Sequence, residues 1–265
     1  MANELTLRSS IESLEGNAGG FDALRDAYGK TQAITDNRGW TYWAGLHGFP
    51  QYKCWHHGRV GNGRTTLPYN LFLPWHRAYL LHWEHTARDQ NAKMALPWWD
   101  WTSRGSQSSG IPKSFTVKTV NGKKNTLVSG PRPSIPGVPA GPTSRAPGRP
   151  VELPTVSQVK ALFDLGNFVD FTDQLEDIHD QVHGWCGGDM GVVATSAFDP
   201  IFWSHHCMID RIWYLWQLKN GLGNIPDDYK DRALAPFGMT VREVLDINRL
   251  GYEYAQGNST VVTHG

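Results

Sequence analysis

The sequence lacks the features that mark membrane-spanning, nucleic-acid-binding and disulfide-rich proteins. It has no run of roughly 18 consecutive apolar residues that could cross a bilayer. Lys and Arg together number 25, as do Asp and Glu, so no basic excess is available to bind nucleic-acid phosphates. The three cysteines are an odd number and cannot all pair within one chain. We therefore expect a globular protein that binds neither a membrane nor a nucleic acid.

A secretory signal is also missing from the beginning of the sequence. Residues 1–8 contain no basic stretch followed by an apolar core, which is the pattern of a signal peptide. This absence favours a cytoplasmic protein, and the sequence otherwise leaves the localisation unknown.

The chain of 265 residues is long enough to bury a large core. We predict a single domain spanning residues 1–265, with its core at about 8–254 and a polar tail at 255–265. Residues 103–154 are rich in Ser, Gly and Pro and are predicted to form a long surface excursion within this domain. The alternative is a linker between two domains, which is disfavoured because the histidines discussed below lie on both sides of it.

Tryptophan and histidine are abundant, with twelve and eleven residues. A buried tryptophan needs a partner for its indole N–H, so this many tryptophans indicate an interior with aromatic walls. A single inward-facing histidine is more often a hydrogen-bonded core residue than a metal ligand. The spacing of the histidines therefore decides whether they predict a metal site.

Two predicted helices in the second half of the chain bring three histidines together. His179 and His183 are spaced i and i+4, so they lie one above the other on a helix that the pattern predicts from Phe171 to His183, ended by Gly184. Asp199 and Pro200 suit the N-cap and first position of the next helix. On that helix His206 shares a face with large apolar side chains. Three imidazoles can thus meet on one metal ion.

The first half of the chain offers a second set of three histidines. A predicted helix over residues 72–89 carries His76 on its apolar face. His47 follows a shorter predicted helix, and the loop after it contains His56 and His57. The second set is therefore His47, His76 and one of the two loop histidines.

These elements predict a mainly α fold, with a four-helix bundle around two metal ions and long loops. A small β-hairpin is expected between segments 114–120 and 126–128, joined through Asn121 and Gly122. Coordination by imidazole alone suits copper, zinc or iron, and two such sites with open positions suit a copper pair that binds dioxygen. Zinc is the alternative metal. However, Asp180 stands where a metalloprotease helix would carry Glu, and a single zinc ion would leave three histidines unused.

Two motifs surround these histidines: Phe72-Leu73-Pro74-Trp75-His76-Arg77 with Leu80 and Glu84, and Asp199-Pro200-Ile201-Phe202-Trp203 with His206 and Asp210. They resemble the tyrosinase, catechol oxidase and haemocyanin group of coupled dinuclear (type 3) copper proteins. The resemblance covers about residues 8–254. It implies two copper ions, Cu A and Cu B, and dioxygen as co-substrate. The implied ligands are His47, His56 and His76 for Cu A, and His179, His183 and His206 for Cu B.

The choice of the second Cu A ligand stays open between His56 and His57. Cys54 favours His56, because many members of this family carry a Cys-x-His element in which the sulfur forms a thioether with the ligand ring. The alternative is a free buried cysteine. His57 precedes a glycine, as the family ligand usually does. His205, directly before the ligand His206, is implied to lie beside the metal without binding it.

The resemblance implies an oxidoreductase, a polyphenol oxidase that converts o-diphenols to o-quinones with O2. Glu176 matches the glutamate that orients a water molecule in tyrosinases, which favours an additional monooxygenase activity, the ortho-hydroxylation of monophenols. Asp180 stands where the family commonly has Asn, and we expect its charge to alter the basicity of that water. Glu176 and Asp180 are therefore the candidate catalytic residues.

Two alternatives remain: a catechol oxidase without monophenolase activity, and a haemocyanin-like protein that binds dioxygen. Because the sequence ends soon after Tyr254, we expect no covering C-terminal domain, which favours the enzyme. The expected partners are small phenols and O2. Melanin biosynthesis is a family expectation, and the need for a copper-loading helper protein and the oligomeric state stay open.

Overall fold

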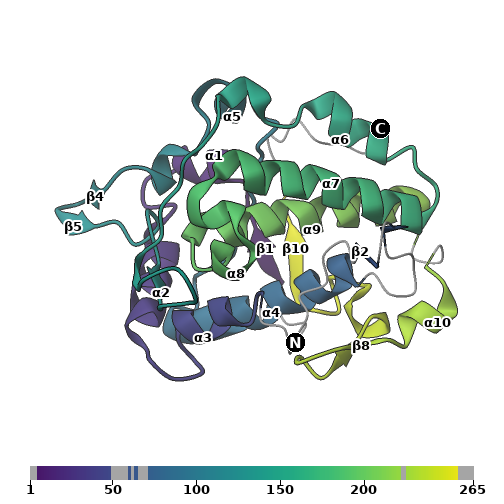
Figure 1. The fold of residues 1–265 in the computed structure, drawn as a ribbon, viewed down its shortest axis with the longest axis horizontal. Helices are drawn as coiled ribbons and strands as arrows, with labels where there is room; N and C mark the ends of the chain where they lie inside the picture. The colour runs from purple at the N-terminus through teal and green to yellow at the C-terminus, as the bar shows by residue number, and fades with distance from the viewer. Residues whose placement is uncertain (1–4, 49–58, 61–62, 65–70, 222–224, 256–265) are drawn as a thin grey trace.

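The computed structural model describes residues 5–48, 59–60, 63–64, 71–221 and 225–255. Four helices form the centre of the fold: α2 (Asp22–Ala33), α4 (Phe72–Gln90), α7 (Phe168–Cys186) and α9 (Pro200–Asn220). Helix α4 packs against α2 on one side and α9 on the other, and α7 runs alongside α9 (Figure 1). The mainly helical fold class with a helix-bundle core is confirmed.

Helix α9 begins where the sequence predicts. The Asp199 carboxylate accepts a hydrogen bond from the Ile201 N–H at 3.0 Å, and Pro200 takes the first helical position. Seventeen of its residues are buried, so this helix lies in the centre of the bundle. Its burial on all sides explains why the apolar stripe continues beyond one face.

Helix α7 is longer than the sequence predicts, because the pattern indicates a helix only from Phe171 to His183. The Asn167 side chain accepts a hydrogen bond from the Val169 N–H at 2.8 Å and starts the helix earlier. The helix passes through Gly184 and ends before Gly187, whose φ of 58° favours glycine. A single glycine lowers helix stability but does not end a helix that is packed on both flanks.

Shorter helices surround the bundle. The α-helices among them are α1 (Ile11–Glu15), α3 (Trp40–Gly45), α5 (Arg104–Ser109), α6 (Val156–Leu162), α8 (Val193–Ser196) and α10 (Asp227–Lys230). The 3-10 helices are η1 (Lys113–Phe115), η2 (Pro150–Glu152), η3 (Gly188–Gly191) and η5 (Arg242–Val244).

The described strands are short and form two-stranded pairs. Strand β1 (Thr6–Arg8) pairs in parallel with β10 (Tyr252–Tyr254), joining the two ends of the described chain in the middle of the fold (Figure 1). The antiparallel pairs are β2 (Arg59–Val60) with β3 (Gly63–Arg64), β4 (Thr119–Val120) with β5 (Lys123–Lys124), β6 (Pro131–Arg132) with β7 (Gly141–Pro142), and β8 (Ala233–Leu234) with β9 (Met239–Thr240).

The predicted hairpin is present but smaller than the pattern indicates. Asn121 and Gly122 have φ of 49° and 73° and form its turn, as expected for a tight hairpin. Only Thr119–Lys124 pairs, because Ser114 and Phe115 belong to a 3-10 helix whose Phe115 ring packs edge-on against Phe21, 6.2 Å between centroids. Tertiary packing of the aromatic ring therefore overrides the strand pattern.

A buried ion network joins β1 and β10 to the bundle. Arg8 pairs with Glu84 of α4 at 2.7 Å, and Arg77 of the same helix pairs with Asp210 of α9. The Tyr252 hydroxyl donates to Asp210 at 2.7 Å. Buried charges of this kind must be paired, and these pairs fix the relative position of α4 and α9. Arg77 and Asp210 thus pair with each other within the bundle.

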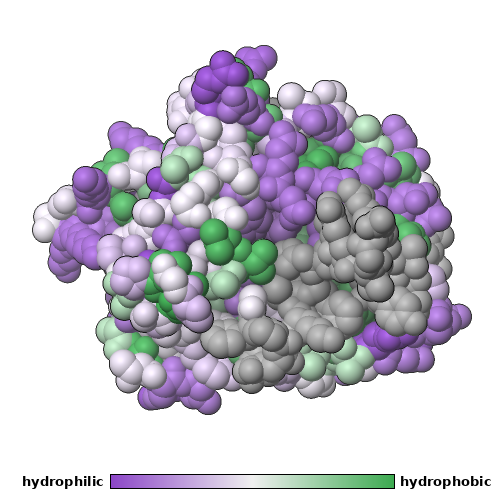
Figure 2. Space-filling model, viewed as in Figure 1, coloured by the Kyte–Doolittle hydropathy of each residue, from purple (hydrophilic) through white to green (hydrophobic). Residues whose placement is uncertain are grey.

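The tryptophans fill the interior. Among the described residues nine tryptophans are fully buried, and Trp83 stacks on Trp203 with 4.7 Å between ring centroids. In the view of Figure 2 the described surface is mostly polar, with small apolar patches. None of the helices in the described part of the chain has an apolar stretch sufficient for a membrane crossing.

Candidate metal centre

The bundle brings five of the predicted ligands to one place. Helix α4 contributes His76, α7 contributes His179 and His183, and α9 contributes His206, while His47 lies two residues after α3. Their nitrogens form two groups, within each of which the candidate ligand atoms lie within 4.8 Å of one another. The first group consists of His47, His76 and His206. The second group consists of His179, His183, His205 and His206. The two sets are therefore adjacent.

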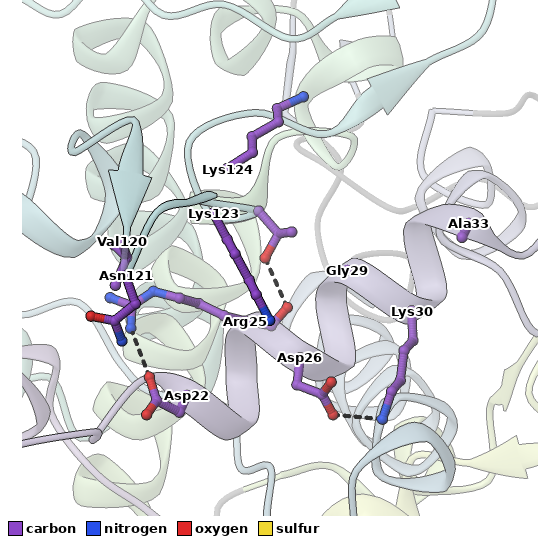
Figure 3. A pocket seen from close by; sticks show the side chains of 11 residues that line it. Asp22, Arg25, Asp26, Gly29, Lys30, Ala33, Val120, Asn121, Lys123 and Lys124 are labelled. Atoms are coloured by element: carbon purple, nitrogen blue, oxygen red, sulfur yellow. Dashed lines mark hydrogen bonds and ion pairs between the residues drawn. The ribbon is translucent and has the colours of Figure 1, made fainter.

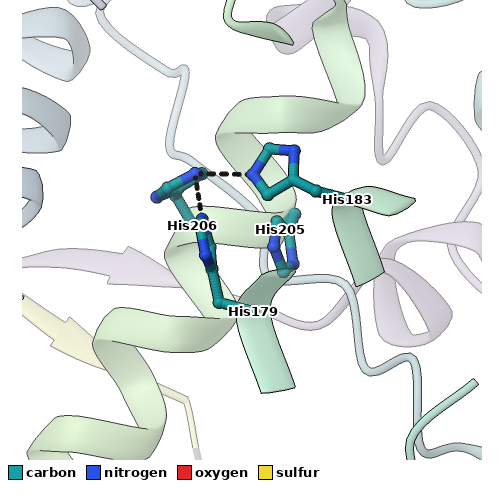
Figure 4. Close-up of side chains that lie close together, drawn as sticks. All are labelled: His179, His183, His205 and His206. Atoms are coloured by element: carbon teal, nitrogen blue, oxygen red, sulfur yellow. Dashed lines mark hydrogen bonds between the residues drawn. The ribbon is translucent and has the colours of Figure 1, made fainter. Parts of the chain in front are cut away.

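In the second group three ring nitrogens converge. His206 Nε2 lies 3.2 Å from the Nε2 atoms of both His179 and His183 (Figure 4). Ligands bound at about 2.0 Å in a tetrahedral arrangement are about 3.3 Å apart, so this spacing suits a metal ion. The i, i+4 spacing on α7 places two of the rings, and packing of α9 against α7 supplies the third.

Backbone carbonyls fix the tautomer of three of these imidazoles. Carbonyl oxygens accept from Nδ1 in three rings: Phe72 O from His76 at 2.8 Å, Val193 O from His47 at 2.9 Å, and Met190 O from His183 at 2.7 Å. A carbonyl can only accept, so it assigns the proton to Nδ1 and the lone pair to Nε2. These contacts orient the rings as ligand contacts do in metal proteins.

Burial keeps these imidazoles neutral. It lowers the pKa of His47 to about 3 and that of His183 to about 4, and the pKa of His76 and His206 falls well below the usual value for the same reason. Only a neutral imidazole offers a lone pair to a metal ion, so the environment favours metal binding at neutral pH.

Aromatic side chains form the walls of this region. The ring centroid of Phe202 lies 4.0 Å from that of His206 and 4.8 Å from that of His47. Phe72 packs edge-on against His179 at 4.7 Å. These apolar contacts hold the imidazoles in place and lower the local dielectric.

His205 lies among the candidate ligands of the second group. Its ring stacks on His179 with 5.1 Å between centroids and an interplanar angle of 14°, and burial lowers its pKa. The sequence places it beside the metal, and the structure includes its nitrogen in the second group (Figure 4).

Three of the sequence predictions concern residues outside the described ranges. His56 and the alternative His57 are among them, and so is Cys54 with its predicted thioether. The third ligand of the predicted Cu A set, beside His47 and His76, therefore stays a prediction.

The two candidate catalytic carboxylates differ in environment. Glu176 is fully buried one turn before His179. The pKa of Tyr229 is raised mainly by the burial of Tyr229 and also by the negative charge of Glu176. The Asp180 side chain is 54% exposed and its Oδ1 accepts a hydrogen bond from His179 Nδ1 at 2.9 Å. Asp180 thus contacts a candidate ligand directly.

The segment between the second-group ligands contributes atoms that the sequence did not reveal. The carbonyls of Met190 and Val193 carry no residue-specific signal, because every residue has one. The only sequence clue is Gly187-Gly188, whose φ of 58° and 55° turn the chain back towards α7. Val192 and Val193 are about half exposed, whereas Phe198 is buried in the core.

A cavity of about 540 Å³ lies elsewhere, between α2 and the β4–β5 hairpin. No histidine lines it, and its charged residues include the exposed pair Asp26 and Lys30, 2.7 Å apart (Figure 3). It lacks the convergent buried donors of the histidine groups, so the chemistry belongs to the latter.

Comparison with known proteins agrees with this geometry. The family model described as the common central domain of tyrosinase matches residues 37–219. Tyrosinase from Streptomyces antibioticus is 33% identical over 188 residues, which cover 62% of this chain and 68% of that protein. A haemocyanin of Enteroctopus dofleini (A-type, units Ode to Odg) is 26% identical over 94% of this chain, which spans only 22% of that much longer protein.

The fold is likewise similar to a solved structure of Burkholderia thailandensis tyrosinase. The TM-score is 0.79 at 20% identity, covering 96% of this chain and 74% of that one. The two histidine groups fit the dinuclear copper centre of these proteins. The chain belongs to the tyrosinase family of type 3 copper proteins.

Proposed function

We propose that this protein is a copper-dependent polyphenol oxidase that converts o-diphenols to o-quinones and also hydroxylates monophenols at the ortho position. The observation that carries this proposal is the adjacency of the two imidazole groups, with His206 near members of both. In the overall diphenol reaction two catechols and one O2 give two o-quinones and two water molecules.

The proposed ligands are His47, His56 and His76 for Cu A, and His179, His183 and His206 for Cu B. The copper pair, when bound, supplies O2 binding and two-electron redox chemistry. The carbonyls of Met190 and Val193 hold the proton at Nδ1 of His183 and His47, so that the lone pair of each ring lies on Nε2. Phe72 and Phe202 exclude water from the inner side of the rings.

The outer side offers groups for the substrate. Val192 and Val193 are exposed next to the carbonyls that contact the histidines, and they can pack against a phenol ring. Asp180 holds the His179 ring through its hydrogen bond. Glu176 is proposed to orient a water molecule that accepts the phenol proton in the hydroxylation reaction.

We also propose the thioether between Cys54 and His56. Its formation removes the S–H hydrogen and one ring C–H hydrogen, with the two electrons passing to copper and O2. The intact mass of copper-loaded protein is then lower than the sequence mass by about 2 Da, the mass of the two lost hydrogens. An unchanged mass together with full copper loading contradicts the thioether.

The test of the proposed function uses copper-loaded, full-length protein with catechol and, separately, tyramine. We expect quinone formation from both, and loss of both activities in His206→Ala. His85 lies exposed on α4 outside both groups, so His85→Ala is the matched control and keeps the activity. If the protein oxidises catechol but does not hydroxylate tyramine even after any lag, it is a catechol oxidase without monophenolase activity. Absence of both activities with full copper loading contradicts the enzyme.

A haemocyanin-like dioxygen carrier is the second candidate. The match to the Enteroctopus haemocyanin over 94% of this chain favours it. Reversible oxygen binding by copper-loaded protein that does not oxidise catechol supports the carrier and excludes the oxidase.

A further inference from the structure

A single short segment contacts one candidate ligand of each copper ion. Residues Gly188–Ser196, which comprise η3 and α8 and are called the bridging segment below, supply the Met190 carbonyl to His183 and the Val193 carbonyl to His47. His183 belongs to the Cu B set and His47 to the Cu A set. A displacement of this segment therefore changes the orientation of one imidazole in each set.

Asp189 fastens the bridging segment to the excursion at residues 103–154. Its carboxylate accepts a hydrogen bond from the Ser144 N–H at 2.8 Å, and its own N–H donates to the Ser144 carbonyl at 2.9 Å. Arg132 Nε forms an ion pair with Asp189 Oδ1 at 2.8 Å, a contact by charge and distance whose N–H is not aligned for a hydrogen bond. The Thr195 hydroxyl donates to the Asp189 carbonyl at 2.8 Å, which ties η3 to α8.

The Arg132–Asp189 pair is well shielded from water. The exposed fractions of the two side chains are 7% and 10%. Removal of one partner from such a pair leaves a poorly solvated charge, and the backbone must move to hydrate it. Gly188 lies so close to the Ser144 carbonyl that a Cβ at this position would collide with it, which shows how closely the segment packs here.

We propose that Arg132 and Asp189 are positioning residues of the metal centre. Their ion pair fixes the bridging segment, and the segment fixes the Nδ1 contacts of His183 and His47. The excursion thus reaches both copper ions through one backbone stretch. This inference rests on the proposed copper function for its effect on metal binding, whereas its effect on the histidine rings does not require metal.

His76 provides an internal control within the same centre. Its Nδ1 contact is with the Phe72 carbonyl of its own helix, at 2.8 Å, and involves no residue of the bridging segment. A variant that moves the segment therefore changes His47 and His183 and leaves His76 unchanged. General destabilisation of the fold offers no such distinction between the three rings.

The first measurement is the exchange of the imidazole Nδ1–H protons with solvent, followed by NMR in metal-free protein. In Arg132→Met we expect at least tenfold faster exchange for His47 and His183 and no change for His76. Arg132→Lys keeps the charge and is expected to restore part of the protection. The control is Arg149→Met, which removes an exposed arginine of the same excursion that pairs with Glu152. The proposal is overturned if the Nδ1–H exchange rates of His47 and His183 in the folded Arg132→Met variant are the same as in unaltered protein.

The second measurement is the copper dissociation constant, obtained by competition with a chelator well below the unfolding temperature. We expect Arg132→Met and Asp189→Asn each to weaken copper binding at both sites by about 10- to 100-fold, as loss of outer contacts does at other metal centres. The double variant should bind copper no more weakly than the single variant with the larger effect, because both substitutions break the same contact.

The outcomes separate this proposal from the proposed function. If unaltered protein binds no copper, the copper function fails, and the proton exchange still decides whether Arg132 positions the rings. If unaltered protein binds two copper ions and the folded variants bind them equally well, the positioning role alone fails. If Arg132→Met does not fold, Asp189→Asn carries the same comparison.

Discussion

The two histidine groups are built differently. In the group that contains His179, His183 and His206, all ligands come from long helices that pack directly against each other. In the other group His76 and the shared His206 lie on long helices, while His47 follows the six-residue α3 and is oriented by a carbonyl of the bridging segment. The bundle thus places every ring of the helical group, whereas the other group also needs the short connection after α3. Each group takes one Nδ1 contact from the bridging segment.

His206 is where the two groups meet, so its loss tests the comparison most severely. We expect His206→Ala to lower catechol turnover and copper affinity by more than about 100-fold, because loss of outer contacts alone costs about 10- to 100-fold. Chelator competition and catechol oxidation are the measurements, with His85→Ala as the control. Retention of one tightly bound ion would show that the groups are more independent than their adjacency indicates.

The start of α9 is held by a residue from the excursion. The Arg145 guanidinium pairs with both oxygens of Asp199, the N-cap of α9, at 2.6–2.9 Å, and the Asp199 side chain is fully buried. Arg145→Met leaves that carboxylate unpaired and is expected to lower the free energy of unfolding by about 3–5 kcal/mol. Urea unfolding measures this change.

The control for that experiment is Arg149→Met, which breaks an exposed pair and should change the unfolding free energy by less than about 1 kcal/mol. Equal effects of the two variants would contradict the view that the helical group depends on this buried contact.

Acid should destabilise the metal-free protein through both groups. The pKa of His47 is lowered to about 3 and that of His183 to about 4, from an ordinary value near 6.5 that applies in the unfolded chain. Their stabilising contribution is therefore present above pH 6.5 and is lost as the pH falls towards the folded values. Between pH 6.5 and 5 we expect a loss of about 2 kcal/mol for each buried ring.

Urea unfolding of metal-free protein at pH 7, 6 and 5 measures this loss. Constant or rising stability over that interval would contradict the neutral, buried state of the rings in one or both groups.

The smallest expected effect concerns Asp180. Asp180→Asn keeps an oxygen that accepts from His179 Nδ1 but removes a half-exposed negative charge next to the helical group. We expect copper affinity to stay within about threefold, and the ratio of tyramine to catechol turnover to rise about two- to fivefold, because a phenolate then meets less repulsion. Steady-state kinetics with both substrates measure the ratio. A lower ratio would indicate that the carboxylate assists hydroxylation.

Local patterns predicted the helical group well. The i, i+4 spacing of His179 and His183 and the Asp199-Pro200 helix start depend only on neighbouring residues, and the structure places these residues as expected. Histidine 47 and His76 were also identified from predicted helices. The resemblance of the flanking motifs then indicated the metal.

Features that depend on distant contacts could not be predicted in the same way. The pairing of β1 with β10 joins two three-residue strands from opposite ends of the described chain, and neither strand is long enough to give a periodic pattern. The carbonyl contacts of Met190 and Val193 and the ion pair of Arg132 with Asp189 require the path of the chain in space. The predicted length of α7 is wrong because Gly184 resembles a helix end, whereas the helix continues to Cys186.

The copper content of purified protein, combined with its absorption after addition of hydrogen peroxide, tests the central claim most directly. The account predicts two copper ions per chain and the intense near-ultraviolet band of a coupled copper pair. A single bound ion, a preference for zinc, or two copper ions without that band would contradict it.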